Sequence, residues 1–173
     1  MSVVAARKYA DRLVFAADSI RISGYLTETS RVSGHEQGKL FEVNDIVIGS
    51  VGWIMELSFM QLFARNHKPS TATVEAVLEY IVEFYAWAKK KDDTFGKRNS
   101  YLIGMESEIF RVSDGYLVEK INEFSAIGAG REFALTAMYL DKNPQEAVEI
   151  ANELCVYCAA PVNTIVKHVR TTV

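Results

Sequence analysis

The sequence predicts an α+β fold of four layers, an αββα sandwich in which two sheets pack face to face and a pair of helices covers each sheet. Two observations carry this prediction. Short apolar runs typical of strands come in groups, and long amphipathic runs typical of helices come in pairs. The order is strands, two helices, strands, two helices and a last strand, which indicates α+β layering rather than alternating βαβ units.

The first group of strands occupies residues 3 to 50. Its runs are rich in β-branched or aromatic residues, or alternate between apolar and polar ones. We expect strands at Val3–Ala6, Leu13–Ala17, Ile20–Leu26, Lys39–Val43 and Ile46–Ser50. Asn44-Asp45 is typical of a tight turn, so the last two strands should form a hairpin.

The first helix pair follows Gly52. Trp53–Asn66 is too long and too apolar for a strand, and we expect a largely buried helix there. In Thr73–Lys91 the apolar residues recur at spacings of three and four, which predicts an amphipathic helix with Ser70 or Thr71 as its N-cap. The polar segment Lys89–Ser100 should be a loop.

The second half repeats this order. We expect strands at Tyr101–Met105, Ile109–Val112 and Tyr116–Ile121, with a tight turn at Ser113-Asp114-Gly115. Gly128-Ala129-Gly130 should open a helix over Arg131–Leu140. Asn143 is a natural N-cap, and Pro144 suits the first turn of a helix that runs from Gln145 to about Leu154. Val162–Lys167 is the expected last strand.

Composition and charge exclude several classes of protein. The 173 residues form a single expected domain, 1–173, because no linker or repeat divides them. The net charge of −3 disfavours a nucleic-acid partner. The apolar runs are far shorter than the ~20 residues of a membrane helix, and the N-terminus lacks the pattern of a signal peptide. We therefore expect a cytoplasmic protein that is not inserted in a membrane.

The cysteines and histidines give weak signals. Cys155 and Cys158 form a CxxC pair near a helix end, without the second ligand pair that zinc needs, so structural burial is the favoured interpretation. His35, His67 and His168 are scattered singly and predict no catalytic triad. We expect no cofactor.

The start of the chain carries chemistry. Ser2 is small enough that Met1 should be removed, which would leave a hydroxyl and a free α-amine on one residue. That amine has a pKa of ~7.7–8.0, so near neutral pH it can accept the hydroxyl proton. Taken alone, Ser2 is more simply interpreted as a common second residue.

Several segments together change that balance. The run SVVAARKYADRLVFAADS resembles the first hairpin of proteasome β subunits and of the HslV-like bacterial peptidase that works with an ATPase unfoldase. In both, an acidic residue follows the nucleophile by sixteen positions, as Asp18 follows Ser2. Lys39 in GKLFEVNDIVIGSVGW is similar to the family's lysine, and Gly49 and Gly52 fit its G-x-x-G stretch. AIGAGREF and IANELCVY, at residues 126–133 and 150–157, also resemble family segments.

The resemblance implies a proteasome-subunit-like N-terminal nucleophile (Ntn) hydrolase. Ser2 would be the nucleophile, Lys39 would lower the pKa of its amine and hydroxyl, and Asp18 would hold the lysine. The backbone N–H of Gly52 would face the oxyanion. The substrate would be a peptide or unfolded polypeptide, and the chains would assemble into homo-oligomeric rings, with an ATPase unfoldase as a partner.

The sequence departs from the family at three places. Ser2 replaces the usual threonine, and Ala129 replaces a serine that hydrogen-bonds near the terminal amine. Cys155 and Cys158 occupy positions where the family has other residues, in a segment whose backbone carbonyls bind a monovalent cation in the bacterial relative. Retained Met1 would block the terminal amine. The alternatives are therefore an inactive scaffold or assembly subunit that keeps Met1, and an amidase for small molecules.

Overall fold

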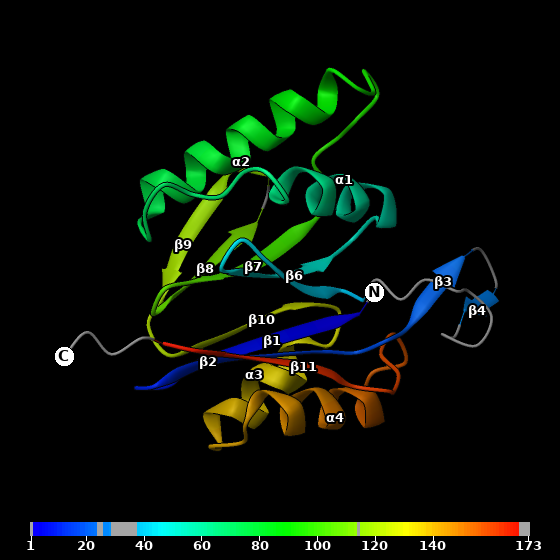
Figure 1. Ribbon diagram of the computed structural model, residues 1–173. Coiled ribbons are helices and arrows are strands. Elements are labelled where there is room, and N and C mark those ends of the chain that lie inside the picture. Colours follow the sequence, from blue (N-terminus) through cyan, green and yellow to red (C-terminus); the bar gives the residue numbers. More distant parts are fainter. Residues whose placement is uncertain (1, 24–25, 29–37, 114, 170–173) are drawn as a thin grey trace.

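The computed structural model describes residues 2–23, 26–28, 38–113 and 115–169, and in that part of the chain it shows the predicted four layers (Figure 1). One sheet has four antiparallel strands in the order β10 (Phe124–Gly128), β1 (Val3–Lys8), β2 (Arg12–Ala17) and β11 (Asn163–His168). The other has five antiparallel strands in the order β5 (Leu40–Val43), β6 (Ile46–Val51), β7 (Ser100–Met105), β8 (Glu108–Ser113) and β9 (Leu117–Ile121).

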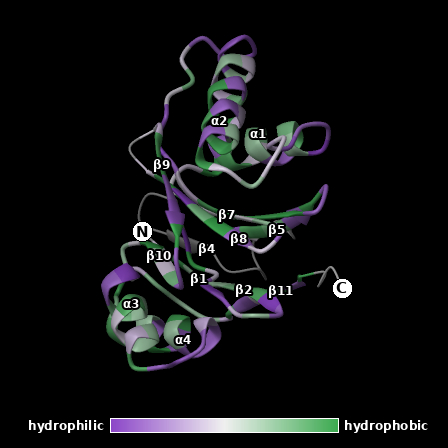
Figure 2. Ribbon diagram, turned by 90° about the vertical axis from the view of Figure 1, so that its left-hand side faces the viewer, coloured by the Kyte–Doolittle hydropathy of each residue, from purple (hydrophilic) through white to green (hydrophobic). Residues whose placement is uncertain are grey.

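A pair of helices covers the outer face of each sheet (Figure 1). The five-stranded sheet is covered by α1 (Ile54–Ala64) and α2 (Val74–Lys89), and the four-stranded sheet by α3 (Arg131–Tyr139) and α4 (Pro144–Leu154). In Figure 2, which colours the chain by hydropathy, green apolar stretches occur on the strands and on the helices of both halves. The short strands β3 (Arg21–Ser23) and β4 (Leu26–Glu28) pair with each other and project from the sandwich.

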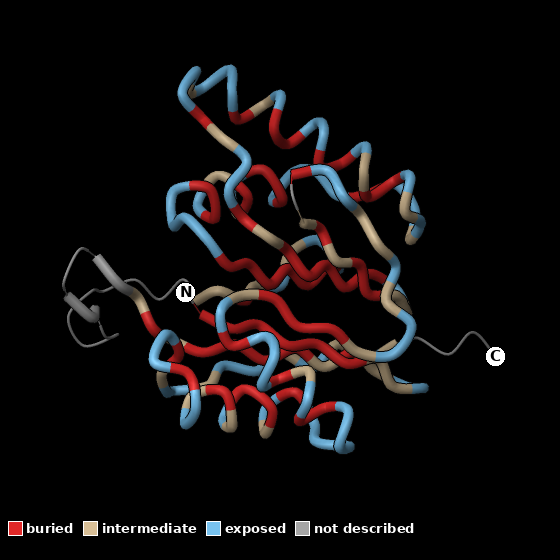
Figure 3. Tube along the Cα trace, turned by 180° about the vertical axis from the view of Figure 1, so that it is seen from behind, coloured by how far each residue is buried: buried red, intermediate tan, exposed pale blue. Residues whose placement is uncertain are grey.

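Three clusters of buried apolar residues lie between the four layers. Figure 3 shows buried stretches of the chain in both sheets and in the helices that cover them. Strand β1 serves two clusters at once. Val3 and Ala5 pack toward α3 and α4, while Val4 and Ala6 pack against the five-stranded sheet. Successive side chains of a strand point to opposite faces, so a strand covered on both faces must be apolar throughout. This accounts for the unbroken apolar run at the start of the chain.

One predicted turn and one predicted cap are confirmed, and one predicted cap is corrected. The predicted turn at Ser113-Asp114-Gly115 includes Asp114, which lies outside the described residues. Asn44 and Asp45 both have positive φ angles, 49° and 64°, as a two-residue hairpin turn requires. Asn143 caps α4 as predicted, in a reciprocal capping box with Glu146. The N-cap of α2 is Thr73, whose hydroxyl accepts from the Ala76 N–H, and not Ser70 or Thr71.

Three other expectations are corrected. Ile20–Leu26 is not one strand, because it contains parts of two strands, β3 and β4, which pair antiparallel with Ser23 opposite Leu26. Strand β10 was not predicted, because its Ser, Ala and Gly residues have low strand propensity. The helix in Trp53–Asn66 is only partly buried: several of its apolar side chains are half exposed, namely Trp53, Ile54, Met55 and Leu62.

The strand register gathers the candidate site residues at one end of each sheet. Val4 lies opposite Ala17, so Ser2 and Asp18 come to the same end of the four-stranded sheet. Leu40 lies opposite Gly49 and Val51 opposite Ser100, so the residues that flank these positions gather at one end of the five-stranded sheet.

Candidate active site

A cavity of about 670 Å³ opens at this end of the sandwich, between the two sheets. Ser2, Lys39 and Gly52, three of the four residues singled out from the sequence, line it. Asp18, the fourth, is fully buried behind Lys39. The fold therefore brings together residues that are separated by up to fifty positions in the chain.

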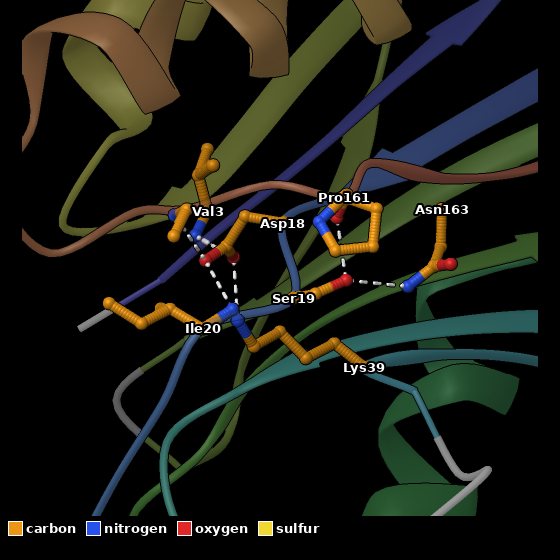
Figure 4. A network of polar contacts seen from close by, with 8 residues as sticks. Val3, Asp18, Ser19, Ile20, Lys39, Pro161 and Asn163 are labelled. Carbon is orange, nitrogen blue, oxygen red and sulfur yellow. Dashed lines mark hydrogen bonds and ion pairs between the residues drawn. The ribbon is translucent and has the colours of Figure 1, made fainter. Parts of the chain in front are cut away.

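Asp18 and Lys39 form a buried ion pair, with Nζ 2.7 Å from Oδ1 (Figure 4). The same Oδ1 accepts from the Val3 N–H at 2.8 Å, and Oδ2 accepts from the Ile20 N–H at 3.1 Å. A buried carboxylate is costly unless hydrogen bonds satisfy both oxygens, and here backbone donors from two segments do so together with the ammonium. The Asp18 side chain is thus fixed, and it fixes the lysine.

The surroundings lower the pKa of Lys39 below its ordinary value. Burial is the largest cause, since only 13% of the side chain is exposed, and the charge of Arg21 acts in the same direction. The charge of Asp18 opposes both. Lys39 therefore releases its proton more readily than a lysine in water, although the charge of Asp18 favours its ammonium form.

Ser2 is held by its backbone. Its N–H donates to the Tyr157 carbonyl at 2.9 Å, and its carbonyl accepts from the Gly130 N–H at 3.2 Å. Its φ is 99°, a conformation that side chains rarely adopt, and the residue is buried. Such outliers persist only where the surroundings enforce them. Gly130 has to be glycine, because a Cβ there would lie 2.7 Å from the Cys158 sulfur.

Gly52 is held by Asn99, which the sequence did not point to. Gly52 has a φ of 134°, and a Cβ at this position would collide with the Asn99 side chain. The buried Asn99 amide donates to Ser50 Oγ and to the Trp53 carbonyl, each at 3.0 Å, and accepts from the Trp53 N–H. Asn99 thereby fixes the turn that carries Gly52 at the cavity wall.

Glu56 in turn holds the segment that carries Asn99. It is 2% exposed, and its carboxylate accepts from the hydroxyls of Tyr85 and Tyr101 at 3.0 and 2.8 Å. It also accepts from the backbone N–H groups of Arg98 and Asn99. Burial and the Glu56 charge raise the pKa of both tyrosines. The only sequence signal was a glutamate inside an otherwise apolar helix.

Cys155 and Cys158 are both buried, as predicted. Burial, followed by the charge of Asp18, raises the pKa of the Cys158 thiol to about 12, so it stays protonated. The Cys155 carbonyl accepts from the Cys158 N–H, and the Tyr157 carbonyl accepts from Ser2, so these acceptors serve donors of the chain itself. A monovalent cation bound by this segment stays a prediction.

The histidines and the other possible metal ligands do not cluster in the described part of the chain. Across residues 2–23, 26–28, 38–113 and 115–169, no group of three or more His, Cys, Asp or Glu side chains is arranged to hold a metal ion. His67 is stacked on Phe63 with 4.1 Å between ring centroids, and His168 is exposed at the end of β11. His35 lies outside the described residues.

Comparison with known proteins gives matches among solved structures alone. No protein-family model and no curated protein matches the chain. Thiobacillus denitrificans BPH in complex with epoxomicin matches with a TM-score of 0.86 and 22% identity over 98% of this chain and 100% of that one. A second structure of Thiobacillus denitrificans BPH matches with a TM-score of 0.85 and 22% identity over 98% of this chain and 99% of that one. Eukaryotic HslV from Trypanosoma brucei matches with a TM-score of 0.73 and 19% identity over 95% of this chain and 98% of that one.

These matches extend over nearly the whole of each chain, so the protein has the fold of BPH and HslV. The predicted αββα sandwich is confirmed, and so is the structural likeness to HslV-type chains that the sequence segments indicated.

Proposed function

We propose that the chain is an N-terminal nucleophile peptidase, in which Ser2 becomes the first residue once Met1 is removed. The observation that carries the proposal is the buried 2.7 Å ion pair of Asp18 and Lys39 in the wall of the cavity that Ser2 lines. A positive charge held beside a hydroxyl and an amine lowers the pKa of both, which is what such a nucleophile needs. The fold shared with BPH, whose structure holds epoxomicin, supports it.

The proposed reaction uses each of these groups. The α-amine of Ser2 takes the proton of its own hydroxyl as the oxygen attacks a peptide carbonyl. The backbone N–H of Gly52 donates to the oxyanion that forms. The C–N bond then breaks, the departing amine takes the proton from the α-ammonium, and Ser2 carries an ester. Water, deprotonated by the same amine, hydrolyses the ester and restores the hydroxyl.

Two residues act through others in this scheme. Asp18 positions Lys39, because its carboxylate is fixed by the N–H groups of Val3 and Ile20. Asn99 positions Gly52, because it clamps both the N–H and the carbonyl of Trp53. Both are positioning residues, and neither needs to contact the substrate.

We further propose that the protein works as a homo-oligomeric ring in the cytoplasm on peptides or unfolded polypeptides, with an ATPase unfoldase as a partner. Exposed apolar side chains support assembly. They lie on α1 and directly after α4, at Ile54, Met55, Leu62, Val156 and Tyr157. None of the described helices is long and apolar enough to cross a membrane.

The proposal is tested by intact mass and covalent labelling of the purified protein. We expect the mass of one methionine to be missing, and epoxomicin to add one inhibitor mass to each chain. Ser2→Ala should abolish both labelling and peptide cleavage, while Ser2→Thr, which keeps the hydroxyl, should retain both. A chain that lacks Met1 and folds normally but neither labels nor cleaves would contradict the proposal.

A specific observation favours a second candidate, an inactive scaffold. Ala129 lies in the exposed turn between β10 and α3, next to the Gly130 N–H that binds Ser2, and supplies no hydroxyl for proton transfer. The scaffold predicts intact Met1 and no labelling. Ala129→Ser distinguishes the two: it should raise the cleavage rate of a peptidase and leave a scaffold silent. Cleavage of small amides but not peptides would instead favour an amidase.

A further inference from the structure

A buried carboxylate lies behind the turn that precedes α1. Glu56 is 2% exposed and does not line the cavity, so a peptide bound in the cavity would not contact it. Four donors engage its two oxygens. Oε1 accepts from the hydroxyls of Tyr85 and Tyr101. The same oxygen accepts from the Asn99 N–H at 3.3 Å, and Oε2 accepts from the Arg98 N–H at 2.8 Å.

The place of Glu56 within α1 shows what this arrangement replaces. Trp53 is the N-cap of α1 and its side chain caps no N–H group, while Glu56 is the third residue of the helix. In a capping box, a glutamate at that position accepts from the N–H of the N-cap residue. Here Asn99 accepts from the Trp53 N–H, and Glu56 binds the segment that carries Asn99. The start of α1 therefore depends on a distant side chain that Glu56 holds in place.

The position of Gly52 depends on the same contacts. The Asn99 amide binds residues on both sides of Gly52, namely Ser50 through its hydroxyl and Trp53 through its N–H and carbonyl. A displacement of Asn99 would therefore move the turn that contains Gly52. A backbone N–H stabilises an oxyanion well only when it lies ~2.7–3.1 Å from that oxygen, so a small displacement of the donor weakens catalysis.

The two tyrosines connect this carboxylate to the aromatic core. Tyr85 belongs to α2 and Tyr101 to β7, and both lie in the cluster of buried apolar residues that these elements share. Their hydroxyls donate to Glu56 at 3.0 and 2.8 Å. A buried carboxylate is held in place by its hydrogen bonds, so the loss of either hydroxyl should loosen Glu56 and then the segment that it binds.

We infer that Glu56 is a positioning residue for the oxyanion donor, and that the hydroxyls of Tyr85 and Tyr101 act through it. The inference rests on the proposed function, because the donor that it positions is the Gly52 N–H of the proposed reaction. The connection runs from the hydroxyls to Glu56, from Glu56 to the backbone N–H groups of residues 98 and 99, and from the Asn99 amide to the turn that contains Gly52.

Glu56→Gln tests the carboxylate with almost no change of shape. In either orientation of the new amide, its NH2 group replaces an oxygen that accepts from a backbone N–H, that of Asn99 or that of Arg98. A tyrosine hydroxyl can turn to accept from an NH2 group, but a backbone N–H cannot. We expect kcat for peptide cleavage to fall about tenfold while KM changes by less than about twofold, because the residues that line the cavity are unaltered.

Tyr101→Phe and Tyr80→Phe form a matched pair. Both tyrosines are buried in the aromatic core, but the Tyr80 hydroxyl donates to the Met60 sulfur and not to Glu56. Each substitution removes one buried hydroxyl. We expect Tyr101→Phe to lower kcat about threefold and Tyr80→Phe to leave kcat unchanged, even if both lower the melting temperature alike. Equal effects of the two substitutions on kcat would overturn the inference.

A transition-state analogue separates positioning of the donor from general loosening of the site. When the Ser2 oxygen bonds to the carbon of a peptide aldehyde, the adduct is tetrahedral and carries an oxygen where the oxyanion forms. The matched peptide alcohol forms no such adduct. Glu56→Gln should weaken inhibition by the aldehyde about tenfold and binding of the alcohol by less than about twofold. Equal weakening of both would show that Glu56 does not act through the oxyanion donor.

Hydrogen exchange, followed by NMR, separates failure of the inference from failure of the proposed function, because it needs no turnover. We expect the backbone amides of Trp53, Arg98 and Asn99 to exchange about tenfold faster in Tyr101→Phe and at an unchanged rate in Tyr80→Phe. If this is observed but protein that lacks Met1 cleaves no peptide, the positioning of the turn by Glu56 stands and the peptidase does not. If peptides are cleaved but the two variants exchange and cleave alike, the positioning role is refuted and the peptidase stands.

Discussion

The two helix layers of this sandwich cover their sheets with very different side chains. Between α1, α2 and the five-stranded sheet lies an aromatic core that includes Phe63, Tyr80, Phe84, Phe95 and Tyr101. Between α3, α4 and the four-stranded sheet lies a small-residue core, made mostly of alanine, valine and cysteine. Both helix pairs bury the same kind of sheet face, so the choice of side chain reflects what each half has to do.

The small-residue core lets the backbones approach closely where Ser2 is held. At Gly130 a single added carbon would crowd Cys158, Val3 and Ala151 together. This contact places the Gly130 N–H on the Ser2 carbonyl. The aromatic core supplies bulk, and two of its tyrosine hydroxyls bind Glu56, whose carboxylate also accepts from the N–H groups of Arg98 and Asn99 at the site. We infer that the small-residue core fixes the position of Ser2, whereas the aromatic core contributes most to the free energy of unfolding.

The largest expected effect tests whether the aromatic core carries the stability. Phe84 is fully buried and touches other rings, with centroids 5.6 Å from Phe63 and 5.8 Å from Phe95. Phe84→Ala should lower the free energy of unfolding by about 3–5 kcal/mol, because it leaves a cavity. Urea denaturation measures this. Val82→Ala, on the exposed side of the same helix, should change it by less than about 0.5 kcal/mol.

A smaller effect on stability, but a larger one on the site, is expected in the small-residue core. Gly130→Ala should cost about 1–3 kcal/mol through overpacking and should also slow peptide cleavage, because relief of the crowding would displace the backbone N–H of residue 130 from the Ser2 carbonyl. Gly38→Ala is the matched control, since a Cβ there meets atoms no closer than 3.6 Å. If Gly130→Ala kept full cleavage activity, the close approach would have no role at the site.

The smallest expected effect is a dependence on pH that comes from Lys39. Its pKa is lowered in the folded chain, so just below its ordinary value of 10.5 the unfolded chain binds a proton that the folded chain does not. The contribution of Lys39 to stability therefore rises with pH through that interval. Cleavage, which needs the ammonium, should fall over the same interval. Lys39→Met should flatten the pH slope of the unfolding free energy, and an unchanged slope would contradict this assignment.

The layers were predictable because the spacing of apolar residues differs between strands and helices. Each core requires apolar residues at that spacing on the faces that it covers. β1 was recognised from an unbroken apolar run, and α2 from residues such as Val77 and Ile81, which are indeed buried. β10 could not be recognised, because its small residues form a strand only through pairing with β1. The exposed side of α1 was also missed, since apolar composition alone does not say what covers a helix.

The site was predictable only as far as a resemblance reached. Ser2, Lys39 and Gly52 were singled out in advance and line one cavity, with Asp18 behind it. Asn99 and Glu56 were missed, because an asparagine at the end of a polar loop and a glutamate in a helix look like surface residues. Only the fold shows that their polar atoms point inward. Two tyrosine hydroxyls and two backbone N–H groups satisfy Glu56, and Ser50 and the backbone of Trp53 satisfy Asn99.

The direction of the outer strand β11 has a practical consequence for anyone who expresses this protein. Because β1 and β11 both run antiparallel to β2, the end of β11 lies at the opposite end of the sheet from Ser2. An affinity tag fused at the N-terminus would extend from Ser2, which is buried beside the cavity, and would prevent the proposed removal of Met1. A tag fused after Val173, on the C-terminal side of β11, would leave the Ser2 end untouched, so we expect a C-terminal purification tag to be tolerated better.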